Sequence, residues 1–143
     1  KGIYFTLFSF SFSMIEATYN STDQFLAVMY TGEITADDVI GHGWSLARDT
    51  SLPRHLNILT DVRYANYFFG NDDLQRIRQA LQENLKVFKS LRNAFIHNKP
   101  RETAYSQIVQ SLEQNQTYKH KVFSTRERAL YWLLNQRDVQ SNK

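Results

Sequence analysis

The sequence predicts a single α/β domain in which an N-terminal β-hairpin is followed by repeating helix and strand units. Two short apolar runs at residues 15–19 and 25–30 are joined by the turn-prone letters NSTD, which is typical of a hairpin. After Thr35 the apolar residues change to the helical spacing, and helical and strand-like segments then alternate along the chain. Strands separated by such helices form right-handed crossovers, so we expect a mostly parallel sheet covered by helices. The 143 residues are enough for one core, and we assign all of them to one domain.

The first segment, residues 1–13, predicts an extra aromatic strand. Its phenylalanines alternate with serines, so one face is apolar and the other polar; the apolar face holds Phe8, Phe10 and Phe12. A trimmed signal peptide or an upstream extension before Met14 is the alternative, because a lysine followed by an apolar run has that character. As a strand, the segment would leave an exposed apolar edge unless it pairs within the sheet or with a second copy, which favours a homodimer.

The first predicted helix begins at Thr35, where the letters TADD resemble a capping box. Gly41 and Gly43 within it would each cost about 1 kcal/mol relative to alanine, so we expect both to allow close packing against the sheet. Trp44 on this helix and Trp132 near the end of the chain both fall on apolar helical faces. We expect both indole rings to pack in the core.

The central strand is predicted over residues 55–61, where a short apolar run is typical of burial on both faces. The next helix is predicted to begin at Asn71 or Asp72, either of which is a suitable N-cap. Its sheet-facing side follows the helical spacing through Leu74, Ile77, Leu81, Leu85 and Phe88.

The remaining predicted elements are shorter. They are a strand over residues 93–98, a helix over residues 105–112 and a strand over residues 118–124. Ser124 and Glu127 then predict a capping box for a last helix. Residues 135–143 are polar and are expected to form a frayed tail.

Composition narrows the functional classes. The formal charge is +3 and the isoelectric point is about 9.2, but the basic residues are spread along the chain, so we expect no nucleic-acid partner. The absence of cysteine excludes disulfides, thiolate chemistry and cysteine-ligated metal, and it fits a reducing cytoplasm. No phosphate loop, nucleophile elbow or metal-ligand spacing is present. We therefore expect no cofactor, no metal and no catalytic residue.

The order of several segments carries a family resemblance. The letters AVMYTGEITADDV, NILTDVR, NAFIHN and VFSTRERALYWLL follow one another in an arrangement that resembles the SpoIIAA-like group of STAS domains, which shares features with Sec14-type lipid-binding folds. The resemblance covers about residues 14–134 and implies a small α/β binding domain with no chemistry of its own. The N-terminal aromatic strand lies outside it.

The resemblance also implies a regulatory switch that this chain lacks. Members that antagonise anti-sigma factors present a phosphorylatable serine at the start of the helix after the central strand, whereas residues 70–73 here read GNDD and offer no hydroxyl. A carboxylate at Asp72 would mimic the charge of a phosphate, but an acidic residue at a helix start also has an ordinary capping role. We favour the capping interpretation.

The candidate site follows the central strand, where the letters LTDVRYANYFFGNDDL place four aromatic residues before a helix start. A connection at this point lies beyond the carboxyl ends of the strands, where open α/β sheets bind ligands. We therefore predict a mobile aromatic lid over a pocket with a basic mouth, formed by Arg63, Tyr64, Tyr67, Phe68, Phe69 and His97. The alternative is that Phe68 and Phe69 fold back into the core while the tyrosines cover the helix.

Three functions follow, in order of preference. The first is a non-catalytic regulatory or ligand-sensing module that binds a small apolar anion or lipid at this site. The second is a lipid-binding or peripheral membrane protein, because the same side chains would suit an anionic membrane surface. The third is an enzyme that uses Asp61 and His97 as an acid–base pair, although a recognisable reactive partner is missing from the sequence. We expect a cytoplasmic protein, peripheral to the membrane in the second case.

Overall fold

The computed structural model describes residues 13–97, 99 and 117–135. Within them the chain forms a five-stranded sheet and three helices. The elements in chain order are β1 (Met14–Asn20), β2 (Phe25–Thr35), α2 (Ala36–Arg48), β3 (His55–Phe68), α3 (Asp73–Leu85), β4 (Ser90–Ile96), β5 (Tyr118–Phe123) and α5 (Arg126–Leu134).

The strands lie in the sheet in the same order as in the chain. β1 pairs with β2 in an antiparallel hairpin, whereas β2, β3, β4 and β5 are mutually parallel. The predicted hairpin and the mostly parallel sheet are therefore both present. The hairpin turn is closed by Asn20, whose side-chain oxygen accepts a hydrogen bond from the backbone N–H of Asp23 at 3.0 Å.

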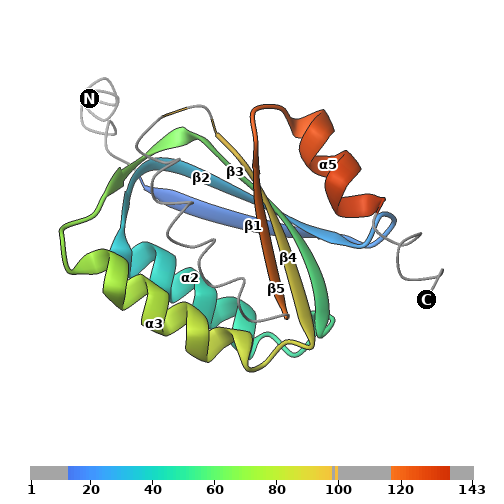
Figure 1. Cartoon of the computed structure of the whole chain (residues 1–143), viewed down its shortest axis with the longest axis horizontal. Helices are drawn as coiled ribbons and strands as arrows, with labels where there is room; N and C mark the ends of the chain where they lie inside the picture. The colour runs from blue at the N-terminus through green and yellow to red at the C-terminus, as the bar shows by residue number, and fades with distance from the viewer. Residues whose placement is uncertain (1–12, 98, 100–116, 136–143) are drawn as a thin grey trace, which may run out of the picture.

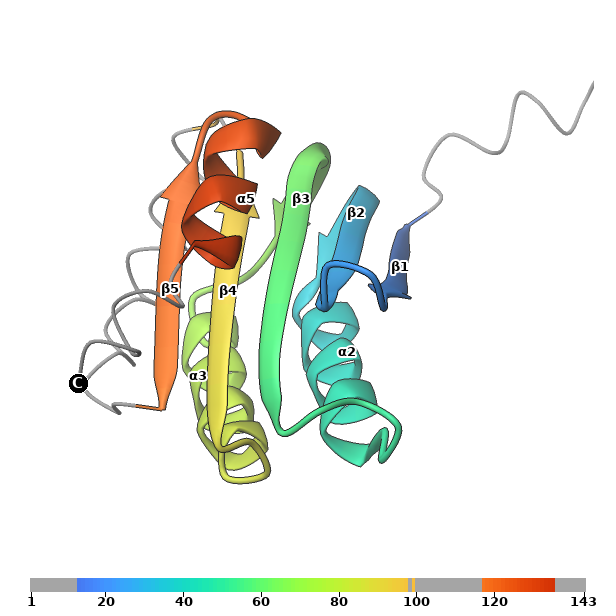
Figure 2. The same cartoon turned by 90° about the vertical axis from the view of Figure 1, so that its right-hand side faces the viewer.

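The helices cover the two faces of the sheet unequally. α2 and α3 lie side by side on one face, and α5 lies on the other (Figure 1). Seen from the α5 side, this helix lies over β4 and also contacts β3 and β5, while no described helix lies over β1 and β2 (Figure 2). At the hairpin side of the sheet, the described helices therefore leave part of one face without cover.

Each face of the sheet has its own apolar cluster. The cluster beneath α2 and α3 includes Ile58, Val62, Ile77 and Leu85. The cluster beneath α5 consists of Phe25, Leu59, Ala94, Ile96, Ala129 and Leu133. Because the adjacent residues Ile58 and Leu59 are 2% and 1% exposed and belong to different clusters, the prediction that the central strand is buried on both faces is confirmed.

The first predicted helix cap is confirmed and the last is shifted by one residue. The hydroxyl of Thr35 accepts the N–H of Asp38 at 3.2 Å, and the Asp38 carboxylate accepts the N–H of Thr35 at 2.9 Å, which is a capping box. At α5, Thr125 rather than Ser124 is the N-cap, and its hydroxyl accepts the N–H of Arg128. Both residues have a hydroxyl, and the glutamate three positions after Ser124 favoured the wrong one.

The start of α3 is capped differently from the prediction. Asp72 is the N-cap, as expected, but its side chain makes no capping hydrogen bond. The carboxylate of Asp73 accepts the N–H of Gly70 at 2.7 Å instead. Four of the five predicted sheet-facing residues are confirmed on this helix: Ile77 and Leu85 are buried, and Leu74 and Leu81 pack against the cluster. Phe88 is buried in the same cluster but lies beyond the end of α3 at Leu85, so its placement on the helix was wrong.

The two glycines of α2 have different environments. A Cβ atom at Gly43 would lie 2.6 Å from Nδ2 of Asn84 on α3, so glycine allows the close approach of the two helices. A Cβ atom at Gly41 would meet no atom within 4 Å. The prediction of close packing is therefore wrong for Gly41, and at Gly43 the close neighbour is α3 rather than the sheet.

The two tryptophans are half-buried rather than fully enclosed in the core. The guanidinium carbon of Arg48 lies 5.5 Å from the ring centroid of Trp44, and that of Arg92 lies 4.5 Å from the ring centroid of Trp132. Trp132 packs against the cluster beneath α5, as predicted, whereas Trp44 belongs to neither cluster. The prediction that Trp44 packs in the core is therefore wrong. Its ring stays half-buried at the surface, where the guanidinium of Arg48 lies over it.

Several predicted segments lie outside the described residues. They are the aromatic strand except for Ser13, the helix over residues 105–112 and the tail beyond Asn135. The homodimer was inferred from the first of these segments and stays a prediction.

Candidate functional site

The segment predicted to be an aromatic connection is a strand. β3 continues to Phe68, and its end pairs in parallel with β2, from Thr31 beside Tyr64 to Thr35 beside Phe68. β4 pairs with β3 only as far as Asp61, so beyond this residue β2 and β3 extend past the other described parallel strands as a two-stranded ribbon. We define the ribbon as residues 31–35 and 64–68. The interpretation of this segment as a loop that forms a lid is therefore wrong.

A β-bulge explains why the sequence pattern concealed this part of the strand. Between Met29 and Thr31 β2 advances by two residues, whereas β3 advances by three, from Asp61 to Tyr64. The extra residue in β3 interrupts the alternation of side chains between the two faces, which a sequence pattern indicates as the end of a strand. Gly32 follows in β2 with a φ of 81°, a left-handed conformation that glycine adopts without strain.

Asp61 and Arg63 hold the bulge together. The Asp61 carboxylate accepts hydrogen bonds from the backbone N–H of Arg63 at 3.1 Å, from its Nε at 3.0 Å and from its Nη2 at 2.8 Å. Burial raises the pKa of Asp61, but the hydrogen bonds and charge of Arg63, with the charge of Arg126, outweigh burial and hold this pKa below its usual value. The pair is therefore ionised and has no net charge.

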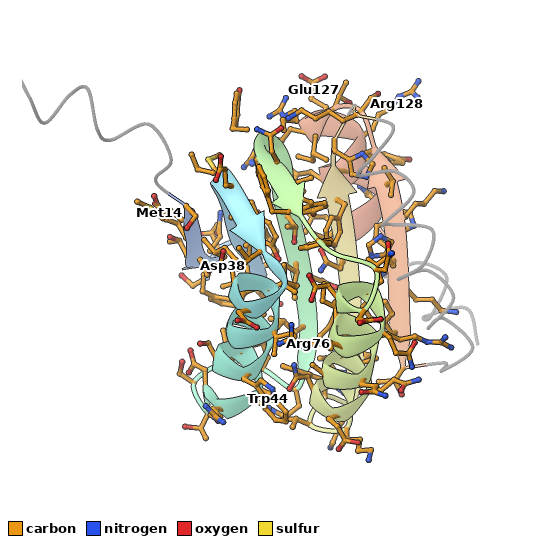
Figure 3. The ribbon with its side chains drawn as sticks, turned by 90° about the vertical axis from the view of Figure 1, so that its left-hand side faces the viewer. Met14, Asp38, Trp44, Arg76, Glu127 and Arg128 are labelled. Carbon is orange, nitrogen blue, oxygen red and sulfur yellow. The ribbon has the colours of Figure 1, made fainter. Side chains whose placement is uncertain are left out.

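The outer face of the ribbon carries exposed aromatic rings. Tyr64 and Phe68 are 62% and 52% exposed, and their even spacing in β3 places them on the same face. Met14 pairs with Thr31, which pairs with Tyr64, so this methionine and this tyrosine share a face. Met29, two residues before Thr31, is also exposed on that face. We call Met14, Met29, Tyr64 and Phe68 the open apolar face; Figure 3 labels Met14 at the start of β1.

The other two predicted aromatic residues belong to the inner side. Tyr67 is 2% exposed in the cluster beneath α2 and α3, and its ring stacks on that of Phe69 with centroids 4.7 Å apart. Phe69 is half-buried and packs against the same cluster. The four rings are therefore divided between core and surface, and the alternative in which rings fold back holds for Phe69 but not for Phe68.

His97 does not join the exposed rings. It directly follows β4, is 3% exposed, and donates its backbone N–H to the carbonyl of Phe123 at 3.0 Å. Because Asp61 pairs with Ile96, Asp61 and His97 do come from neighbouring strands, as predicted, but β3 continues beyond Asp61, which is therefore not at a strand end. Asp61 is held ionised by Arg63, however, which does not suit it to take up a proton near neutral pH.

Two residues of this region were missed or undervalued by sequence reasoning. Met29 alternates with the buried residues Val28 and Tyr30, and this alternation could have identified it as exposed. Lys99 donates from Nζ to the carbonyl of Ala65 at 2.8 Å and to Oδ1 of Asn66 at 3.1 Å. It thus ties the chain after β4 to the ribbon, a contact that no local pattern indicates.

A small cavity lies on the other side of the sheet, beneath α2 and α3. Its volume is about 70 Å³, well below the roughly 300–1,000 Å³ of typical ligand pockets. His42 lines it, and burial lowers the pKa of this histidine to about 4. Oδ1 of Asn84, which also lines it, has no hydrogen-bond partner within the described residues. The cavity therefore suits a few water molecules rather than a ligand.

The described residues contain no group of three or more histidine and acidic side chains placed to hold a metal ion. None of their helices is long and apolar enough to cross a membrane.

Comparison with known proteins identifies the fold. No protein-family model and no curated protein matches this chain. Among solved structures, an uncharacterised DUF3478-family protein with a SpoIIAA-like fold from Shewanella loihica PV-4 is 18% identical, with a TM-score of 0.57 over 85% of this chain and 93% of that one. An anti-sigma factor antagonist from Mycobacterium paratuberculosis is 15% identical, with a TM-score of 0.46 over 84% and 94%. The first similarity shows that this chain has a SpoIIAA-like fold, as its sequence predicted.

Proposed function

We propose that this SpoIIAA-like domain acts by binding rather than catalysis, as a regulatory or ligand-sensing module, and that its ligand lies on the outer face of the ribbon. The observation that carries the proposal is the exposure of Tyr64 and Phe68 beside two exposed methionines. Large apolar side chains gathered on one open surface commonly mark a binding site. The aromatic residues that drew attention in the sequence thus supply its surface.

The proposed ligand is a small apolar anion such as a fatty acid. Its chain would cover Tyr64 and Phe68, and its carboxylate would approach Arg63, whose guanidinium lies 5.7 Å from the centre of the Tyr64 ring. Nε and Nη2 of Arg63 already donate to the carboxylate of Asp61, so the carboxylate of the ligand gains little net charge attraction from this arginine. We therefore expect the aromatic contacts to provide most of the affinity.

The test is a titration of the full chain with dodecanoate, followed in an amide correlation spectrum. The double variant Tyr64→Ala, Phe68→Ala should bind more weakly by about tenfold or more, because two rings' worth of apolar contact is lost. Tyr19→Ala is the matched control, since Tyr19 is a partly exposed ring on β1 outside the open apolar face. Equal affinity of the double variant and the native chain would overturn the proposal.

A second candidate function is lipid binding at a membrane surface. The open apolar face favours it, because Met14, Met29, Tyr64 and Phe68 are all exposed large apolar side chains. The protein should then sediment with vesicles that contain phosphatidylglycerol, and less of it should sediment with vesicles of phosphatidylcholine alone. If the protein binds free dodecanoate but does not pellet with vesicles, the first function is favoured. If it pellets with vesicles but does not bind free dodecanoate, the second is favoured.

A further inference from the structure

A groove between the edge strand β5 and α5 forms another surface on which aromatic rings and cations meet. Its volume is about 480 Å³, which lies in the range of small-molecule sites. Its lining includes Lys121, Phe123, Glu127, Arg128, Tyr131 and Trp132. None of these residues belongs to the ribbon, and Figure 3 shows Glu127 and Arg128 at the beginning of α5.

The rings give the groove a flat apolar wall. Phe123 and Trp132 are half-buried with ring centroids 5.8 Å apart and planes tilted by 45°. Tyr131 is 72% exposed, more than any other large apolar side chain among the described residues. A planar ligand would therefore find one free ring face at Tyr131 and a fixed pair of rings beside it.

The cations around these rings have no acidic partner in the described part of the chain. No ion pair there involves Lys121, Arg128 or Arg92, although four pairs occur elsewhere. Lys121 Nζ lies 5.8 Å from the ring centroid of Phe123. Arg92 lies against Trp132, and its buried Nε has no hydrogen-bond partner within the described residues. Glu127 is the one carboxylate named in the lining, so the groove has a positive balance.

These observations define the chemistry of an occupant. Arginine and lysine both bind phosphate, arginine through a planar fork and lysine as a point charge. Exposed aromatic rings stack on flat heterocycles irrespective of their exact identity. An apolar aliphatic chain would use the rings but would leave the unpaired cations unsatisfied.

We propose that this groove is a second binding site, which takes a small aromatic phosphate of the size of a nucleoside monophosphate. The phosphate is held by Lys121 and Arg128, and the flat ring lies against Tyr131. Arg92 does not line the groove and contributes positive potential from behind Trp132. The site does not depend on the function proposed for the ribbon.

The experiment is a titration of the full chain with adenosine monophosphate, observed at the indole N–H resonance of Trp132. The chain has two tryptophans, and Trp44 lies toward the opposite end of the molecule from Glu127 and Arg128 (Figure 3). The variant Trp44→Phe assigns the resonance of Trp132. We expect this resonance to shift saturably with the nucleotide, and adenosine or inorganic phosphate alone should bind more weakly.

Matched variants test which side chains hold the ligand. Arg128→Gln and Lys121→Gln should each weaken binding by about tenfold, because each removes a hydrogen bond to a charged group. Arg78→Gln is the control, since Arg78 is an exposed arginine on α3, on the other face of the sheet. Tyr131→Ala should weaken the binding of both the nucleotide and adenosine. Thermal unfolding of all four variants checks that the fold is retained.

Several outcomes would overturn the proposal. The first is a Trp132 resonance that does not shift when the nucleotide is added. The second is a loss of affinity in the Arg78→Gln control as large as in the groove variants. The third is full affinity in both of the single variants Arg128→Gln and Lys121→Gln. Indole-3-acetate that binds as tightly as the nucleotide would overturn the assignment to a phosphate. The double variant Tyr64→Ala, Phe68→Ala should leave nucleotide binding unchanged, which separates this test from that of the ribbon.

Discussion

The ribbon and the groove both place an arginine beside aromatic rings, but the two arginines differ in their partners. Arg63 at the ribbon donates two side-chain hydrogen bonds to the buried carboxylate of Asp61. Arg128 at the groove has no ion pair among the described residues, and neither has Lys121. The positive charge of the ribbon is therefore used within the fold, whereas that of the groove is available to a ligand.

The difference shows that a basic residue near aromatic residues is not sufficient to define an anion site. Arg63 closes a β-bulge, so its charge serves the local structure of β3. The exposed rings at the ribbon consequently suit apolar contact, and those at the groove suit contact with a charged planar molecule.

The largest expected effect separates the two faces of the ribbon itself. Tyr67→Ala should reduce the free energy of unfolding by about 3–5 kcal/mol, because it leaves a cavity in the core beneath α2 and α3. Tyr64→Ala should cost only about 1 kcal/mol, mainly its contact with Arg63. Urea unfolding of the two variants measures both values. Equal losses would show that Tyr64 is also a core residue and would remove the basis of the ribbon site.

The next effect compares the two arginines. Arg63→Gln should reduce the free energy of unfolding by about 1.5–3 kcal/mol, because the buried carboxylate of Asp61 loses its charged partner. Arg128→Gln should change stability by no more than about 0.5 kcal/mol, since its side chain has no ion pair to lose among the described residues. Chemical denaturation at one ionic strength gives both numbers. A larger loss for Arg128→Gln would mean that its charge also serves the fold.

The smallest effect is the pH dependence of stability that the ion pair between Asp61 and Arg63 imposes. Because the pKa of Asp61 is lower in the folded chain than in the unfolded one, its stabilising effect is complete above the unfolded pKa of about 3.9 and is lost as pH falls through the folded pKa. The stability difference between the native chain and Asp61→Asn should therefore shrink between neutral pH and the acid range. In an Arg63→Gln background the guanidinium no longer outweighs burial, which raises the pKa of Asp61, so this pH dependence should disappear or change sign. A difference that stays constant with pH would contradict the pairing.

Most of the architecture could be predicted because its signals are local and periodic. The spacing of Leu74, Ile77, Leu81 and Leu85 defined α3, and the capping box at Thr35 defined the start of α2. The apolar run at residues 55–61 identified the central strand because both of its faces are buried. These features need no knowledge of the rest of the chain.

The candidate site could be predicted only in part because its decisive feature is a bulge. The extra residue near Arg63 shifts the alternation, so residues 64–68 looked like a connection although they continue β3. Tyr64 and Phe68 are exposed as the site requires, whereas Tyr67 is in the core and His97 is buried at another strand end. The groove was missed because Lys121 and Arg128 meet only when α5 folds onto the sheet beside β5.

The contrast between the two arginines can be measured by following their side chains while adenosine monophosphate is added to the full chain. The Nε–H resonances of Arg63 and Arg128 report the two surfaces in one spectrum. We expect the resonance of Arg128 to shift saturably and that of Arg63 to stay in place, because the Nε–H of Arg63 remains bonded to Asp61. A shift of Arg63 with no response of Arg128 would contradict the claim that the available positive charge lies at the groove.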